Sequence, residues 1–184
     1  MSSYKIISLS RFLHQYPRET VSGILSSFLC ERDKDVESFL KEKAIVQEIK
    51  QISRTYLMFT ATGHEPVAYF TVAVNSMDGS SLECSKSLQK KMNIHNKIAH
   101  SYLIGQIGKR DGSEKGLGKF ALDSAVELIM AVNSKVGCRV IRLDCKPSLK
   151  DYYESNGSIF AGRNRDNDLS QMISIIESHP LQKA

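Results

Sequence analysis

The chain has 184 residues, 41% of them apolar, which is enough to bury one sizeable hydrophobic core in a single domain. An excess of basic over acidic residues gives a net charge of +5, which permits an anionic partner without identifying it. The four cysteines form no CxxC pair and no apolar run approaches the roughly 18 residues of a membrane span, so we expect reduced thiols, no bound metal and a cytoplasmic protein.

The first half of the chain alternates between strand-like and helix-like patterns. Residues 4–9 (YKIISL) predict a short strand, and residues 33–53 predict a helix, with Val36, Phe39, Leu40 and Ala44 on one face and acids in the first turn. The segments TYLMFTA (55–61) and PVAYFTVAVN (66–75) predict a β-hairpin. The polar stretch 76–98 is weakly patterned, and we interpret it as an insertion with at most a short helix.

The second half begins with a strand–helix–strand pattern. SYLIGQIG (101–108) predicts a strand, Leu117 opens a helix that Gly137 is placed to end, and CRVIRLDC (138–145) predicts the next strand. Such a unit places two parallel neighbours under a right-handed crossover. KDYYES (150–155) predicts a helix closed by Asn156 and Gly157, and two strands, SIFAG and SQMISII, complete an α/β fold with a mixed sheet.

The turn that enters the helix at Leu117 reads GSEKGLGKF (112–120). A helix amino terminus exposes unsatisfied N–H groups and partial positive charge, so a glycine turn at this point predicts an anion site. Four cations around it would reinforce the attraction: Lys109, Arg110, Lys115 and Lys119. The alternative that Gly116 and Gly118 merely allow a tight connection stays open.

Two other phosphate-binding patterns fit the turn less well. A P-loop is excluded because five residues, not four, separate Gly112 from Gly118, and Phe120 replaces the magnesium-binding hydroxyl. Gly116, Gly118 and Ala121 satisfy GxGxxA, but the polar KRDGSEK separates them from the preceding strand, where a dinucleotide fingerprint follows directly. An NAD-type oxidoreductase therefore remains a minor alternative.

Several segments together resemble the Gcn5-related N-acetyltransferase (GNAT) family. SEKGLG (113–118) stands where the family binds the pyrophosphate of acetyl-CoA with an Arg/Gln-x-x-Gly-x-Gly signature, and KDYYESNG is similar to its FYEKNGF segment. FLCERDKDVESFLKEKA, SRTYLMF and EPVAYFTVAV resemble the amino-terminal half of the branch of toxin-type acetyltransferases that act on aminoacyl-tRNA. The resemblance implies one GNAT-like domain over residues 1–184, with flanking helices and central parallel strands that splay apart.

The resemblance also implies the site residues. The main chain of Ile107, Gly108 and Lys109 would pair with the pantetheine of acetyl-CoA, and Tyr153 would be the general acid that protonates the departing thiolate. The pyrophosphate would lie on a turn formed by Ser113, Glu114, Lys115, Gly116, Leu117 and Gly118. Ser113 replaces the family's arginine or glutamine, so the backbone amides after it would carry more of the binding.

The sequence constrains the acceptor substrate less than it constrains the fold or the cofactor. No general base stands out among His64, His95, His100 and Glu127, and an α-amino group, with a pKa of about 7.7 to 8.0 against about 10.4 for lysine, needs none. This favours the α-amino group of aminoacyl-tRNA, and Arg163 and Arg165 are compatible with nearby RNA. A small-molecule or protein amine, or a CoA-binding regulator with little catalysis, is the alternative, and the resemblance adds an antitoxin and a homodimer as expected partners.

Overall fold

The computed structural model describes residues 4–164 and 167–177 and divides the chain into two compact units. The first unit comprises residues 1–73 and 104–128, and the second comprises residues 74–103 and 129–184. Seven strands form a mixed sheet in the order β1-β2-β3-β4-β5-β7-β6, which confirms the predicted α/β fold class. Strands β3 and β4 and helix α6 contribute residues to both units.

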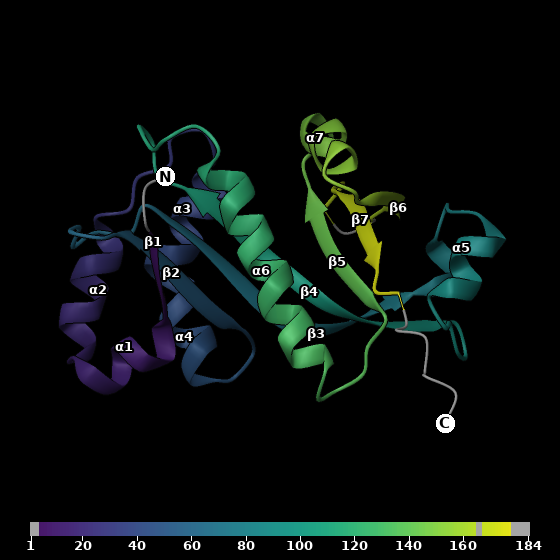
Figure 1. Cartoon of the computed structure of the whole chain (residues 1–184), viewed down its shortest axis with the longest axis horizontal. Coiled ribbons are helices and arrows are strands. Elements are labelled where there is room, and N and C mark those ends of the chain that lie inside the picture. The colour runs from purple at the N-terminus through teal and green to yellow at the C-terminus, as the bar shows by residue number, and fades with distance from the viewer. Residues whose placement is uncertain (1–3, 165–166, 178–184) are drawn as a thin grey trace, which may run out of the picture. The chain divides into compact units, whose positions relative to one another are not determined.

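The first unit holds the amino-terminal helices and the start of the sheet (Figure 1). Its complete elements are β1 (Tyr4–Ser8), α1 (Leu9–Gln15), α2 (Arg18–Ser26), α3 (Lys34–Ser38), a π-helical turn (Phe39–Lys43), α4 (Ala44–Ile49) and β2 (Arg54–Thr60). It also contains the first part of β3 (Ala68–Asp78), the later part of β4 (Ile98–Lys109) and the start of α6 (Leu117–Asn133). The predicted helix 33–53 is thus one helical segment that passes through a π-helical turn.

The strands of the first unit pair in an antiparallel manner. β1 pairs with β2 and β2 pairs with β3, with Leu57 opposite both Ile7 and Tyr69, which confirms the predicted hairpin. β4 continues the sheet beside β3, where the Arg110 N–H donates to the Val67 carbonyl at 2.8 Å. This bond fixes the point at which the chain leaves β4 for the glycine turn.

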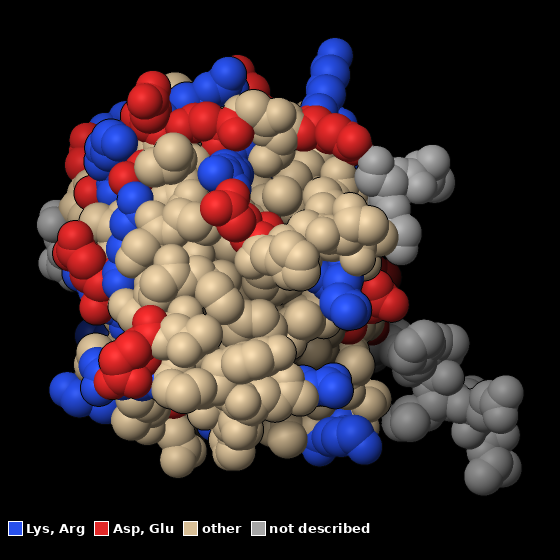
Figure 2. All heavy atoms as spheres, turned by 90° about the vertical axis from the view of Figure 1, so that its left-hand side faces the viewer, with Lys and Arg blue, Asp and Glu red and all other residues tan. Residues whose placement is uncertain are grey.

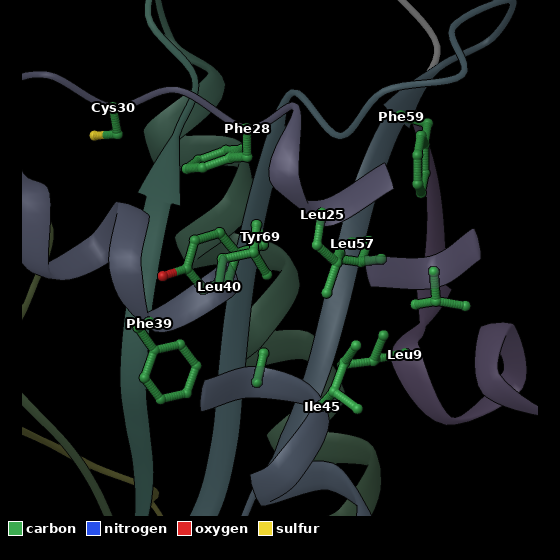
Figure 3. Close-up of a cluster of buried hydrophobic side chains, with 12 residues drawn as sticks. Leu9, Leu25, Phe28, Cys30, Phe39, Leu40, Ile45, Leu57, Phe59 and Tyr69 are labelled. Atoms are coloured by element: carbon green, nitrogen blue, oxygen red, sulfur yellow. The ribbon is translucent and has the colours of Figure 1, made fainter. Parts of the chain in front are cut away.

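Tyr69 is at the centre of the core of the first unit (Figure 3). Its fully buried ring lies 5.4 Å from the ring of Phe28 in an edge-on contact and 6.3 Å from the parallel ring of Phe39. Its hydroxyl donates to the Val36 carbonyl at 2.6 Å, which satisfies a polar group that burial would otherwise penalise. The predicted apolar face of the long helix is confirmed, since Phe39 and Leu40 are buried and Val36 is partly buried.

Helices α1 and α2 were absent from the sequence prediction, although the sequence of each contains a feature typical of a helix. Ser8 caps α1 by accepting from the Arg11 N–H at 3.3 Å, and Leu9 is fully buried. In α2, Val21 and Leu25 recur at a spacing of four residues and are fully buried. These helices are short, and their polar residues conceal the apolar face.

The second unit contains the rest of β3 and β4, the end of α6 and the carboxy-terminal elements. Its complete elements are a 3₁₀ turn (Gly79–Ser81), α5 (Lys86–Lys91), β5 (Val140–Cys145), a 3₁₀ turn (Pro147–Leu149), α7 (Lys150–Ser155), β6 (Ile159–Arg163) and β7 (Ser170–Ile175). β7 pairs with both β5 and β6 in an antiparallel manner. The segment 76–98 carries one short α-helix, α5, as predicted, and β3 extends into it as far as Asp78.

The predicted end of α7 is confirmed, whereas the predicted end of α6 is wrong. Gly157, with φ of 89°, closes α7 as predicted, and its N–H donates to the Glu154 carbonyl at 3.0 Å. Gly137 does not end α6, because the helix stops at Asn133 and Gly137 does not adopt a left-handed conformation. The amide of Asn133 instead donates to the Cys138 carbonyl at 2.6 Å and ties the end of the helix to the next segment.

The structure also addresses the state of the cysteines and the question of a membrane-spanning helix. All four cysteines are free thiols. None of the helices in residues 4–164 and 167–177 combines the length and the apolar character that a membrane crossing requires.

Candidate active site

The turn between β4 and α6 is anchored to other segments of the first unit by main-chain and side-chain hydrogen bonds. Asp111 N–H donates to the Leu29 carbonyl at 2.9 Å, and the Asp111 carboxylate accepts from the Glu31 N–H at 2.6 Å. The Ser113 hydroxyl donates to the Val67 carbonyl at 3.2 Å. Gly112, with φ of 74°, makes the reversal that these bonds require, so the turn is held from the side of β3 and from the side of residues 29–31.

Several N–H groups of this turn have no acceptor. The Ser113 N–H donates to the Arg110 carbonyl at 3.2 Å, and the Leu117 N–H makes a long contact of 3.4 Å with the Glu114 carbonyl. Within residues 4–164 and 167–177, no hydrogen bond occupies the N–H groups of Lys115, Gly116, Gly118 and Lys119. The internal bond at Ser113 therefore leaves the predicted anion site to the residues that follow it.

Neither the backbone nor the packing explains Gly118. Its φ is not left-handed, and a Cβ built on it would meet no protein atom within 4 Å. The space beside it is therefore open, as an anion bound to the N–H groups would require. Gly116 differs, because its φ of 93° is one that a side chain rarely adopts.

Gly108 has a structural explanation of its own. A Cβ on Gly108 would lie 2.2 Å from Cγ1 of Val36 and 3.3 Å from the ring of Tyr69. The glycine therefore allows α3 to pack closely on β4. The half-buried neighbours Ile107 and Lys109 flank this contact, so all three residues predicted for the pantetheine lie on the strand that leads into the turn.

Basic and acidic side chains are mixed around the turn. Lys119 pairs with Asp123 at 2.7 Å, and Arg110 pairs with Glu65. No ion pair in the described part of the chain engages Lys109 or Lys115, so both ammonium groups can face an anion. The carboxylate of Glu114 accepts from the hydroxyl of Tyr4 at 3.0 Å. Leu117 is buried, so of the predicted turn residues it is the one whose side chain serves the core.

Tyr153, the predicted general acid, lies on α7 in the second unit. Its side chain is 6% exposed and lies edge-on to the ring of Tyr152 at 5.2 Å. Burial, followed by the nearby Cys145 and Tyr152, raises the pKa of the Tyr153 hydroxyl above its usual value. The phenol of Tyr153 is therefore protonated at physiological pH, and its hydroxyl makes no hydrogen bond with any described residue.

The thiol of Cys145, which lies near Tyr153, is neutral as well. Burial, and then the charge of Asp144, raises the pKa of the Cys145 thiol to about 11. Asp144 itself is held by Arg142, whose guanidinium donates to both carboxylate oxygens at 2.8 and 2.5 Å. The helix that carries Tyr153 is fixed at its end, because the Ser158 N–H donates to the Tyr153 carbonyl at 3.0 Å.

The other candidate groups that the sequence offered lie at the surface. His100 is exposed, with Nδ1 3.2 Å from the Ser76 hydroxyl, and His64, His95 and Glu127 are likewise exposed. No cluster of three or more His, Cys, Asp or Glu side chains suited to a metal occurs in residues 4–164 and 167–177. Arg163 contacts Asp168 at 3.5 Å at the surface, while Arg165 lies outside the described residues.

Comparison with known proteins yields a fold and no sequence family. The chain matches no protein-family model, and it matches no curated protein. Among solved structures it is similar to a mutant of KacT, with 17% identity, coverage of 95% of both chains and a TM-score of 0.74. It is also similar to AtaT complexed with acetyl-methionyl-tRNAfMet, with 20% identity, coverage of 92% of this chain and 94% of AtaT, and a TM-score of 0.71.

A third similar structure is that of AtaTR bound with AcCoA, with 16% identity, coverage of 95% and 94% of the two chains, and a TM-score of 0.66. KacT and AtaT have the GNAT fold, and the chain therefore has this fold, as the sequence motifs predicted. Identities of 20% and below establish the architecture alone, so activity must be argued from the site.

Proposed function

We propose that the protein is an acetyl-CoA-dependent N-acetyltransferase. One observation carries the proposal: the glycine turn at the start of α6 presents four N–H groups without acceptors among the described residues, and the space beside Gly118 is open. A GNAT fold surrounds this turn, and AtaTR, which is similar in structure, is bound with AcCoA. These facts together support coenzyme A as the anion.

Each group of residues has a defined part in this proposal. The N–H groups of Lys115, Gly116, Gly118 and Lys119 bind the pyrophosphate, and the main chain of Ile107 and its neighbours on β4 orients the pantetheine. Acetyl-CoA supplies the acetyl group as a thioester. N–H donors of β4 that polarise the thioester carbonyl would contribute a few kcal/mol to the transition state.

Tyr153 donates the proton that the departing thiolate needs. The Tyr153 phenol is protonated at neutral pH and can therefore donate, although burial, by raising its pKa, makes it a weaker acid than an exposed tyrosine. Structures similar to this one include Tyr-to-Phe mutants of both KacT and AtaT. Replacement of a tyrosine in those toxins is in keeping with the role proposed here.

The acceptor that we propose is the α-amino group of an aminoacyl-tRNA. AtaT is complexed with acetyl-methionyl-tRNAfMet, and an α-amino group with a pKa of about 7.7 to 8.0 is partly neutral without a protein base. The described histidines offer no obvious base, which agrees with such an acceptor. AtaT also binds the C-terminus of the antitoxin AtaR, so an antitoxin is the partner that we propose for this chain.

The decisive experiment incubates the purified protein with labelled acetyl-CoA and a mixture of aminoacylated tRNAs. We expect label on the α-amino group of one or more amino acids and stoichiometric release of free thiol, both strongly reduced in Tyr153→Phe. Deacylated tRNA is the control and should stay unlabelled. Coenzyme A binding without thiol release would instead support a regulator, and binding of NAD without coenzyme A would contradict the proposal.

The same reaction with cell extract tests the second acceptor class. Label on small-molecule or protein amines with none on tRNA would keep the acetyltransferase and remove the toxin-like substrate. Mass spectrometry of the labelled products distinguishes the two outcomes.

A further inference from the structure

The first unit contains a cavity of about 560 Å³ that belongs to neither part of the candidate active site. Residues from β1, α1, α2, the end of β2 and the loop after it line the cavity. Its polar wall includes Lys5, Arg11 and His64, and its aromatic wall is formed by Phe12, Tyr16 and Phe59. Figure 2 shows this side of the molecule, where a broad uncharged surface is bordered by side chains of both signs, Lys and Arg as well as Asp and Glu.

The charge of the cavity is one-sided. Lys5 and Arg11 are exposed, and neither side chain makes an ion pair or hydrogen bond with any described residue. The residues that line the cavity include no Asp or Glu. Two uncompensated cations beside an apolar wall are suited to a ligand that combines negative charge with apolar groups.

The strand that borders the cavity, β1, has one edge without a partner strand. β1 is the first strand of the sheet order and pairs with β2 alone among the described strands. None of its five residues is buried, and Ile6 is 39% exposed. In an antiparallel pair the N–H and C=O groups of alternate residues point away from the partner, so this edge offers a row of main-chain donors and acceptors.

We propose that the β1 edge and the adjacent cavity bind an extended acidic peptide segment of another protein. The segment adds a strand beside β1, and its alternate apolar side chains enter the cavity beside Phe12 and Tyr16. Its carboxylates pair with Lys5 and Arg11 at the rim. This surface is independent of the proposed acetyl transfer, so it can be present whether or not the chain is an enzyme.

A peptide explains the observations better than a nucleic acid does. A nucleic acid would satisfy the two cations, but it has no alternating donors and acceptors with the spacing of a strand edge. The cavity is also lined by three isoleucines, Ile6, Ile7 and Ile24, which suit aliphatic side chains. The combination of edge strand, apolar cavity and cationic rim therefore selects a polypeptide.

The test selects binders to the full-length protein from a random library of displayed peptides about ten residues long, roughly the length of a long strand. We expect enriched sequences in which Asp or Glu alternates with apolar residues. For one synthetic peptide of this type, Lys5→Glu combined with Arg11→Glu should reduce affinity at least about tenfold at low salt. The matched control is Arg32→Glu with Lys50→Glu, two exposed cations of the same unit that do not line the cavity, and it should change affinity less than about threefold.

Two N-methylated versions of that peptide test strand addition directly. Methylation of one alternate set of peptide nitrogens should abolish binding, and methylation of the other set should leave it within a few-fold, because one set faces β1 and the other faces solvent. The proposal would be overturned if the selection enriched basic peptides, or if both methylated peptides bound equally well. It would also be overturned if the control variant lost as much affinity for the peptide as the Lys5→Glu, Arg11→Glu variant. A short oligothymidylate that competes for the site with the affinity of the peptide, or a second copy of the chain that occupies the edge and blocks the peptide, would overturn it too.

Discussion

Replacement of Gly118 by valine separates cofactor binding from stability. Gly118 is the second residue of α6, adopts an ordinary helical backbone and has open space where a Cβ would point. Valine and glycine differ by only a few tenths of a kcal/mol in helix propensity, so the free energy of unfolding should change by less than about 0.5 kcal/mol. The branched side chain nevertheless fills the volume above the free N–H groups.

The magnitude follows from the hydrogen bonds that would be lost. A hydrogen bond to a charged group contributes about 1.5 to 3 kcal/mol, and the valine would displace the phosphate from at least one N–H group. Since 1.4 kcal/mol corresponds to a tenfold change, the affinity for coenzyme A should fall about ten- to hundredfold. Gly116 is less suitable for this test, because its φ of 93° would add backbone strain to any substitution.

Isothermal titration with coenzyme A and urea denaturation of the same samples provide the two readouts. Gly23→Val is the matched control, because Gly23 lies within α2 and also has no atom within 4 Å of a built Cβ. It should show the same small change in stability and unchanged affinity. Wild-type affinity in a folded Gly118→Val variant would refute the argument that this turn holds the pyrophosphate.

Three further substitutions test other parts of the account. Tyr153→Phe should lower kcat about a hundredfold or more and leave the affinity for coenzyme A within a few-fold; unchanged kcat at neutral pH would remove the residue from the acid role. Gly108→Ala should destabilise the fold by about 1 to 3 kcal/mol in urea denaturation because its Cβ would clash with Val36, and adding Val36→Ala should recover part of that loss; simple additivity would contradict the clash. A hydrogen bond from the Cys30 N–H, and then those from Lys41 and Lys34, lower the pKa of Glu37 from 4.5 to about 2, so this carboxylate stabilises the fold at neutral pH and loses that effect as the pH falls through about 2. Glu37→Gln should therefore reduce the urea midpoint at pH 7, and its difference from wild type should shrink below pH 4.5 and vanish only below about pH 2; a pH-independent difference would count against this origin.

The sheet and the long helix were predictable because their patterns agree with their environment. The hairpin of β2 and β3 has apolar runs on both sides of a glycine-containing loop, and the register places Leu57 opposite Tyr69 as a core pair. α7 was predictable down to its end, because Asn156 is its C-cap and Gly157 supplies the left-handed residue that follows. Local signals sufficed in both places.

Other features depend on contacts that the sequence does not reveal. The main chain of Gly108 was expected to pair with pantetheine, but the packing of Val36 from a helix about 70 residues earlier is enough to require a glycine there. The sequence also did not show that the Arg110 carbonyl accepts from the Ser113 N–H. Such bonds depend on how the turn folds back on itself, and residue types alone do not encode that geometry. The N–H of Lys119, which also has no acceptor among the described residues, was missed for the same reason.

The most direct test of the central claim follows the backbone amide resonances of the ¹⁵N-labelled protein while coenzyme A is added. We expect saturable downfield shifts of the N–H groups of Lys115, Gly116, Gly118 and Lys119, because each would gain a charged acceptor, and smaller shifts for pantetheine, which lacks the pyrophosphate. Saturable binding that leaves these four resonances unmoved, or no binding at all, would contradict the assignment of this turn to coenzyme A.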